Sequence, residues 1–151
     1  MKLFRRTLVK TKFRFISLII FIFTSCCTPL ISQFDATAYR DATSLKVDSL
    51  SVMSEATTPY KLHEKEVSTL EIKLAKAYEY GKGIPHNEIS AQMWERILDP
   101  NKFLLGGFLE RWKEKGSLSA TFVKDEKKQV SEGFDKIICL EANKKEITRC
   151  Q

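Results

Sequence analysis

The spacing of apolar residues beyond position 33 constrains the fold most strongly, because it follows the three- and four-residue period of a helix. In the first such stretch, about residues 34–56, the apolar positions form one stripe made of Phe34, Ala38, Ala42, Leu45, Val52 and Ala56. No stretch of useful length alternates polar and apolar residues, as a half-buried strand does. The sequence therefore predicts an all-α fold, a small bundle of about five helices over residues 34–151.

Capping and breaking residues divide this pattern into separate helices. Thr58 and Pro59 are of the types favoured at the N-cap and first position of a helix, and Asn87 is another favourable cap. Asp99-Pro100 marks a further boundary, because a proline restricts the residue before it. The expected helices cover residues 34–56, 59–80, 88–98, 100–116 and 120–142.

Two glycines and three aromatic residues mark expected points of close packing. Gly106 and Gly107 fall within the fourth predicted helix, where each glycine costs about 1 kcal/mol relative to alanine. We therefore expect the close approach of another helix there, or a local kink. Trp94, Phe103 and Trp112 are expected in the core.

Residues 1–25 differ from the remainder and are expected to form a signal peptide. Their first part holds six basic residues and no acidic one, which favours the cytoplasmic, anionic side of a membrane. The apolar run of residues 15–23 follows, and its nine residues would form a helix of about 14 Å, half of a hydrocarbon core of about 30 Å. This length fits the core of a signal peptide better than a stable membrane span.

The apolar run leads into Phe23-Thr24-Ser25-Cys26, which resembles the lipobox of bacterial lipoproteins, with Phe23 where that family usually has Leu, Val or Ile. The resemblance implies cleavage before Cys26, whose thiol receives a diacylglycerol and whose amino group receives an acyl chain such as palmitate. Cys26 is then the lipid attachment site, residues 26–33 are a lipidated tether, and the membrane is a partner. The alternatives are an ordinary secretory signal and an uncleaved anchor.

The residues after Cys26 bear on the location within the cell envelope. Residues 27–31 contain neither the aspartate that retains many lipoproteins at the inner membrane nor an acidic run that resembles a surface-export signal. By this resemblance, the expected location is the periplasmic face of the outer membrane.

The charge of the chain changes when the signal peptide is left out. The whole sequence has 25 Lys and Arg against 19 Asp and Glu. Six of the basic residues precede Cys26, so the chain from Cys26 onward has 19 of each sign and a formal net charge of zero. Nucleic acid is therefore not an expected partner.

Two further cysteines, Cys139 and Cys150, can meet the oxidising environment outside the cytoplasm. On one unbroken helix they would lie about 16 Å apart, too far for a disulfide. They can pair only if the chain reverses near Asn143. Otherwise Cys139 is a buried helix residue and Cys150 is a free thiol in the tail.

Eight residues are spaced as in a Sel-one-like repeat, a relative of the tetratricopeptide repeat that binds proteins: Ala75, Tyr78, Gly81, Gly83, Ile84, Asn87, Ala91 and Trp94. The resemblance implies two helices packed through a turn that the glycines shape. Such units need about three copies to form a stable stack, and the pattern ends after this one. We therefore expect a single helix-turn-helix with ordinary turn chemistry.

Few residues offer catalytic chemistry. His63, expected on a solvated helix face, and His86 lack the spaced partners of a zinc site, and the sequence has no Gly-x-Ser-x-Gly turn or phosphate-binding loop. No metal, cofactor or catalytic residue is predicted.

The expected function is that of a membrane-anchored envelope lipoprotein that acts as a binding or structural module, with a protein as partner. The alternative is a small envelope enzyme that uses carboxylates such as Glu88, Glu95 or Glu110 in a cleft between helices.

Overall fold

The computed structural model describes residues 31–145 and residue 150. This part of the chain contains helices and no strand, which confirms the predicted all-α fold. The five α-helices, joined by turns and two short 3₁₀ segments (Glu55–Thr57 and Tyr60–Leu62), are α2 (Ala36–Ser54), α3 (Glu64–Gly83), α4 (Glu88–Leu98), α5 (Leu105–Lys115) and α6 (Ala120–Ala142). None of the helices in the described part is both long and apolar enough to cross a membrane.

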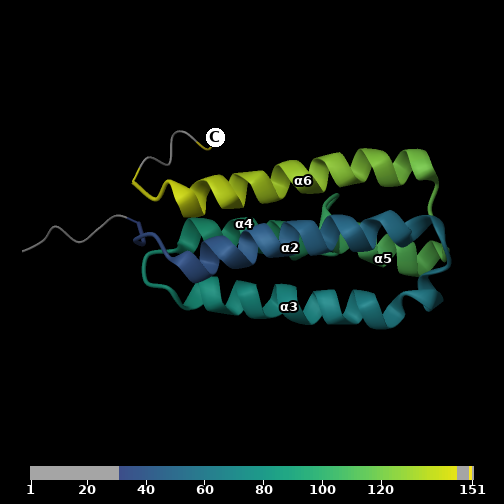
Figure 1. The fold of residues 1–151 in the computed structure, drawn as a ribbon, viewed down its shortest axis with the longest axis horizontal. Helices are drawn as coiled ribbons and strands as arrows, with labels where there is room; N and C mark the ends of the chain where they lie inside the picture. Colours follow the sequence, from purple (N-terminus) through teal and green to yellow (C-terminus); the bar gives the residue numbers. More distant parts are fainter. Residues whose placement is uncertain (1–30, 146–149, 151) are drawn as a thin grey trace, which may run out of the picture.

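The helices form an elongated four-membered bundle in which one member is broken (Figure 1). Helix α2 packs against α3 and α6, and α4 closes the other side by packing against both α3 and α6. Helices α4 and α5 follow each other along the bundle, so together they take the place of one long helix (Figure 1). Successive members therefore run up and down with short connections, the simplest topology of a four-helix bundle.

The start of α2 and the start of α6 both follow from side-chain caps. Asp35 precedes α2, and its carboxylate accepts hydrogen bonds from the backbone N–H groups of Thr37 and Ala38 at 2.8 and 2.9 Å. Ser119 caps α6 by accepting from the N–H of Phe122 at 3.3 Å. These bonds satisfy donors that have no partner within the helix.

The second long helix begins later than predicted, at Glu64 instead of Pro59. The intervening residues are tied to the end of α5: Tyr60 N–H donates to the carbonyl of Gly116 at 2.7 Å, and Trp112 Nε1 donates to the carbonyl of Thr58 at 3.0 Å. These tertiary bonds use backbone groups of residues 58–60 and favour a short 3₁₀ turn over an α-helix.

Gly106 and Gly107 lie in the first turn of α5, and their predicted position in mid-helix is wrong. The close approach at this point involves backbone: a Cβ on Gly106 would lie within 3.0 Å of the Leu98 carbonyl, and one on Gly107 within 3.0 Å of the Lys102 carbonyl. The break between α4 and α5 therefore folds back tightly onto the start of α5.

The core follows the predicted stripes with two exceptions. Phe34 is 58% exposed and Phe103 is 81% exposed, because Phe34 precedes the N-cap of α2 and Phe103 lies in the connection between α4 and α5. Both tryptophans are buried as expected, together with residues from all five helices that include Ala42, Leu45, Val52, Val67, Leu70, Leu74, Phe108, Val130, Phe134 and Ile137.

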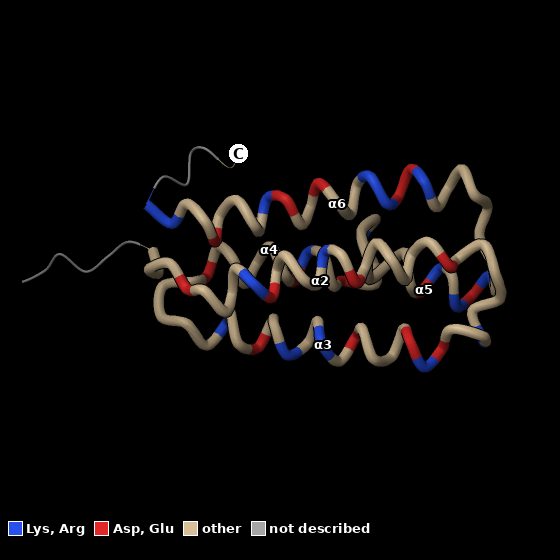
Figure 2. Tube along the Cα trace, in the orientation of Figure 1, with Lys and Arg blue, Asp and Glu red and all other residues tan. Residues whose placement is uncertain are grey.

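Charged residues are distributed along the outer faces. Figure 2 shows acidic and basic positions interleaved along α3 and α6. Two ion pairs join neighbouring helices: Lys46 with Asp135 between α2 and α6 at 2.5 Å, and Lys73 with Asp48 between α3 and α2 at 2.8 Å. Both are largely exposed, so they contribute to the register of the helices more than to stability.

Candidate functional site

The carboxylates considered for an enzyme do not converge in the structure. Glu88 lies in the first turn of α4, while Glu95, further along the same helix, accepts a hydrogen bond of 2.6 Å from the hydroxyl of Tyr78 on α3. This bond, more than any other influence, raises the pKa of Tyr78. Glu110 lies on α5, where it lines a pocket with other residues.

This pocket, here called the α5–α6 pocket, has a volume of about 770 Å³ and is lined by the connection before α5, by α5 and by the start of α6. Phe103 lines this pocket and is the most exposed large apolar side chain among the described residues. A pocket of this size lies in the range of ligand-binding cavities.

Aromatic rings and a cation form one wall of the α5–α6 pocket. The rings of Phe108 and Phe122 are nearly parallel, with centroids 6.2 Å apart, and the guanidinium carbon of Arg111 lies 4.7 Å from the centroid of Phe122. An arginine over an aromatic ring is held by its attraction to the π-system. This wall can therefore offer apolar contact and a positioned positive charge to the same partner.

Glu126 adds a carboxyl group with altered acidity to the α5–α6 pocket. The residue is 8% exposed, and burial raises the pKa of its carboxyl, with Asp125 adding to the rise and Arg111 opposing it. Burial disfavours the charged form, so the protonated carboxyl persists to higher pH than in water. Glu126 was not among the residues predicted for a site, although it lies three positions after Val123 and four before Val130 on the inner stripe of α6.

A smaller groove of about 430 Å³ lies between α2 and α3. Leu62, which is 75% exposed, stands at it together with Val52 and Leu70. It has no aromatic side chain in its lining, and it is the natural comparison for the α5–α6 pocket.

A buried polar cluster occupies the opposite end of the bundle, where α4 begins and α6 ends. Lys144 Nζ donates to Glu141 Oε1 at 2.9 Å and to Asn87 Oδ1 at 2.5 Å, and the hydroxyl of Ser90 donates to the same Glu141 oxygen. Asn87 Oδ1 also accepts from the hydroxyl of Ser32 at 2.9 Å. All five side chains are at least nine-tenths buried.

Two members of this cluster, Glu141 and Lys144, are charged side chains that are buried from water. Lys144 and Glu141 are a buried ion pair, and the second oxygen of Glu141, Oε2, has no hydrogen-bond partner among the described residues. A buried ion pair is costly to desolvate and depends on its further hydrogen bonds. The spacing along α6 indicates that Glu141 is buried, because it lies four positions after Ile137 and seven after Phe134 on the inner stripe of the helix.

Asn87 differs from its predicted role as a helix cap. It occupies the N-cap position of α4 but makes no side-chain capping bond. Its amide donates to the carbonyl of Gly81 at 2.8 Å, which closes the turn between α3 and α4, and its oxygen belongs to the polar cluster. The Asn87 side chain therefore bonds to Gly81 and Lys144 instead of capping α4.

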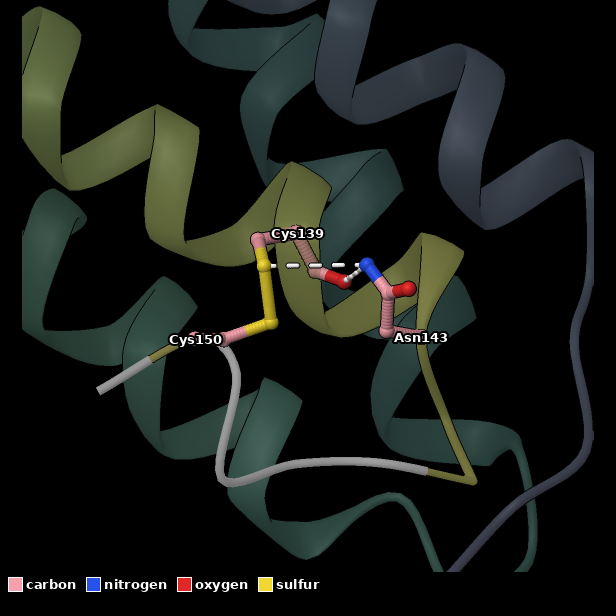
Figure 3. The surroundings of a disulfide bond; sticks show 3 residues. All are labelled: Cys139, Asn143 and Cys150. Carbon is pink, nitrogen blue, oxygen red and sulfur yellow. Dashed lines mark hydrogen bonds between the residues drawn. A yellow bond between two sulfur atoms is a disulfide. The ribbon is translucent and has the colours of Figure 1, made fainter.

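Next to the polar cluster, Cys139 and Cys150 form a disulfide with a Cα–Cα distance of 5.6 Å (Figure 3). Helix α6 ends at Ala142, and the chain turns at Asn143, as pairing requires. The Asn143 amide donates to the carbonyl of Cys139 at 2.9 Å and lies 3.7 Å from its sulfur (Figure 3). Lys144 thus lies inside the loop that the disulfide closes.

The two histidines have structural surroundings. His63 is the N-cap residue of α3, and its ring lies 5.5 Å from that of Trp112 and 2.7 Å from the hydroxyl of Thr58, so its predicted place on a solvated helix face is wrong. His86 lies in the turn before α4 with a positive φ of 61°. Within residues 31–145 and residue 150, no group of three or more His, Cys, Asp or Glu side chains is placed to hold a metal ion.

Cys26, the predicted lipid attachment site, and residues 1–25, the predicted signal peptide, lie outside the described residues. The residues that resemble a Sel-one-like repeat lie in the α3–α4 hairpin, where a Cβ on Gly81 would be 3.7 Å from Asn87 and 3.9 Å from Trp94.

Comparison with models of protein families, with curated proteins and with solved structures found no match to this chain.

Proposed function

We propose that this protein is a bacterial envelope lipoprotein, anchored through Cys26, whose helical bundle binds a protein partner at the α5–α6 pocket. Support for the anchor comes from the lipobox-like residues 23–26 and the signal-like segment before them. The disulfide between Cys139 and Cys150 is in keeping with an oxidising compartment. The proposed location is the periplasmic face of the outer membrane.

The observation that carries the binding role is the exposure of Phe103 at a pocket of about 770 Å³ that Arg111 also lines. Phe103 is 81% exposed, so little of its apolar surface is removed from water and it adds little to the stability of the fold. Aromatic residues and arginine are enriched at protein interfaces and dominate their binding energy. The α5–α6 pocket places both types on one wall.

The anchor is tested by substitution of the two adjacent cysteines. Cys26→Ser should release the protein from membranes or block its maturation, whereas Cys27→Ser should leave it in the membrane fraction. Fractionation and intact-mass analysis are the measurements. An unmodified thiol on Cys26 in the membrane-bound protein would rule out this attachment site.

The binding role is tested by co-purification of the full chain from membranes with its lipid intact. Phe103→Ala and Arg111→Ala should each reduce recovery of a partner, because truncation of an interface anchor costs about 2 kcal/mol or more, roughly a thirtyfold loss of affinity. Leu62→Ala, which removes an equally exposed apolar side chain from the other groove, should not. Equal recovery with all three variants would argue against the α5–α6 pocket.

A small enzyme is the second candidate, and Glu126 is the observation that favours it. A carboxyl group whose pKa is raised by burial stays protonated to a higher pH than in water and can donate that proton, and Glu110 and Glu114 line the same pocket. In that case Glu126→Gln would abolish turnover of a substrate that still binds. Under the binding role, the same variant would retain partner recovery.

A further inference from the structure

Helix α2 begins and helix α3 ends at the same end of the bundle (Figure 1). Three exposed aromatic residues, Phe34, Tyr39 and Tyr80, belong to these two helix ends. The rings of Phe34 and Tyr39 have centroids 6.2 Å apart, and the hydroxyl of Tyr80 donates to Asp35 Oδ2 at 3.0 Å. Phe34, Tyr39 and Tyr80, here called the aromatic end, therefore surround a single residue, Asp35.

The carboxylate at the centre of the aromatic end is fully engaged. One oxygen of Asp35 accepts the two N–H bonds that cap α2, and the other accepts the hydroxyl of Tyr80. A carboxylate satisfied in this way does not need bulk water as its partner. These three bonds do not depend on water, so Asp35 keeps them if the neighbouring aromatic rings leave water.

Among the described residues, the other exposed charges near this end are of both signs. Arg40, Lys82 and Lys145 are exposed near the ends of α2, α3 and α6. The acidic residues nearby in the chain are Asp41 on α2, Glu79 on α3 and Glu88 in the first turn of α4. A surface with this balance is neither drawn strongly to anionic lipid nor repelled by it, so its aromatic groups decide how it meets a membrane.

The length of the chain between the predicted lipid and the bundle limits where the bundle can lie. Phe34 follows Cys26 by eight residues, which span at most about 28 Å when fully extended. Helix α6, with 23 residues, is about 34 Å long. A lipid on Cys26 therefore keeps the aromatic end within about 28 Å of the bilayer, and this is the end of the bundle that the tether enters.

We propose that the aromatic end is a membrane-contact surface, with Phe34, Tyr39 and Tyr80 seated in the interfacial layer of the bilayer that holds the lipid anchor. Aromatic side chains with an apolar body and a polar tip favour this layer. The inference rests on the proposed anchoring through Cys26. The bundle then stands on the membrane, and α5 with its pocket lies toward the opposite end, away from the lipid (Figure 1).

The test is hydroxyl-radical modification of the full, lipidated chain in vesicles of phosphatidylethanolamine and phosphatidylglycerol. In water the rates at Phe34 and Phe103 would follow their exposed fractions of 58% and 81%. Contact with the bilayer should lower the rate at Phe34 relative to Phe103 by about threefold or more, because a side chain below the headgroups loses most of its contact with water. Tyr39 and Tyr80 should be protected in the same sample, and Leu62 should not.

A matched pair of variants checks the role of the cluster itself. Phe34→Ala should raise the modification of Tyr39 and Tyr80, whereas Phe103→Ala, which removes the same side chain elsewhere, should leave it unchanged. A photoactivatable group on the acyl chains of the vesicle lipid should label the peptide that carries Phe34 and Tyr39.

Each contrary outcome has a distinct meaning. Rates at Phe34 and Phe103 in proportion to their exposure, with Cys26 lipidated, would overturn the membrane contact and leave the anchor intact. Protection of Phe34 without labelling from lipid would mean that a protein, including a second copy of this chain, covers the aromatic end, and would also overturn it. An unmodified Cys26 by intact mass would remove the anchor and this inference together.

Discussion

Gly106 and Gly107 have no side chain at the point where the connection between α4 and α5 folds back, and backbone carbonyls occupy the space a Cβ would need. Backbone cannot move aside as a flexible side chain can, so we expect Gly106→Ala and Gly107→Ala each to lower the free energy of unfolding by about 1–3 kcal/mol. This exceeds the gain of about 1 kcal/mol from better helix propensity. Chemical unfolding followed by the fluorescence of the buried Trp94 and Trp112 measures it.

Gly83 is the control for this prediction. It also lies in a helix, but a Cβ there would meet nothing within 4 Å. Gly83→Ala should change the free energy of unfolding by no more than about 0.5 kcal/mol. If the Gly106 and Gly107 variants were as stable as the Gly83 variant, the connection would be able to shift, and the tight packing would not be a requirement of the fold.

Glu126 predicts a pH dependence of stability. Its pKa is raised in the folded state, so the folded protein holds a proton that the unfolded chain releases, and its contribution to stability is lost as pH rises from the unfolded toward the folded pKa. Glu126→Gln should therefore be more stable than the parent at pH 7 and should lose less stability between pH 4 and pH 7. Urea unfolding at both pH values is the measurement.

Glu132→Gln is a matched change at an exposed position of the same helix. It removes an exposed carboxylate and leaves the buried Glu126 carboxyl in place. Its stability profile with pH should follow that of the parent. If the stability of Glu126→Gln changed with pH in the same way as that of the parent and of Glu132→Gln, water would reach the Glu126 carboxyl freely.

At the scale of elements, the end of α6 is joined to the start of α4 through charge as well as apolar contact. Lys144→Ala would leave Glu141 buried without its cation, and we expect a loss of about 3–5 kcal/mol in the free energy of unfolding. The double variant Glu141→Leu, Lys144→Met should recover most of this loss, since no uncompensated charge remains. Equilibrium unfolding of the parent, Glu141→Leu, Lys144→Met and the double variant forms a complete cycle.

Lys145→Ala is the neighbouring control, because Lys145 is exposed while Lys144 is buried. We expect a change within about 0.5 kcal/mol. If Lys144→Ala were equally mild, Glu141 would have another partner in the folded protein, and the buried cluster would not depend on Lys144.

At the scale of the whole molecule, the disulfide adds a covalent link to a bundle with a single core. Cys139 and Cys150 are 11 residues apart, and closing a loop of this length stabilises a domain by about 3 kcal/mol in the chain-entropy description. Reduction, or the double variant Cys139→Ser and Cys150→Ser, should lower the free energy of unfolding by this amount. Unfolding with and without reductant measures the effect, and the double variant should show no response to reductant.

The all-α class and most of the core could be predicted because both depend on local periodicity. Apolar residues at three- and four-residue spacing placed Ala42, Leu70 and Ile137 in the core, and the limits of α6 follow from a serine cap and the end of its apolar stripe. The same periodicity failed for Phe34 and Phe103, since each lies just outside a helix, where the spacing no longer sets the direction of a side chain.

The sequence by itself determined the helical periodicity, the main helix boundaries and the balance of charge, because each depends on residues close together in the chain. Only the tertiary structure decided that Ser32, Asn87 and Lys144 meet in one buried cluster and that residues 58–60 bond to the end of α5. These features depend on hydrogen bonds between residues more than 50 positions apart, and no local pattern encodes which distant donor will meet which acceptor.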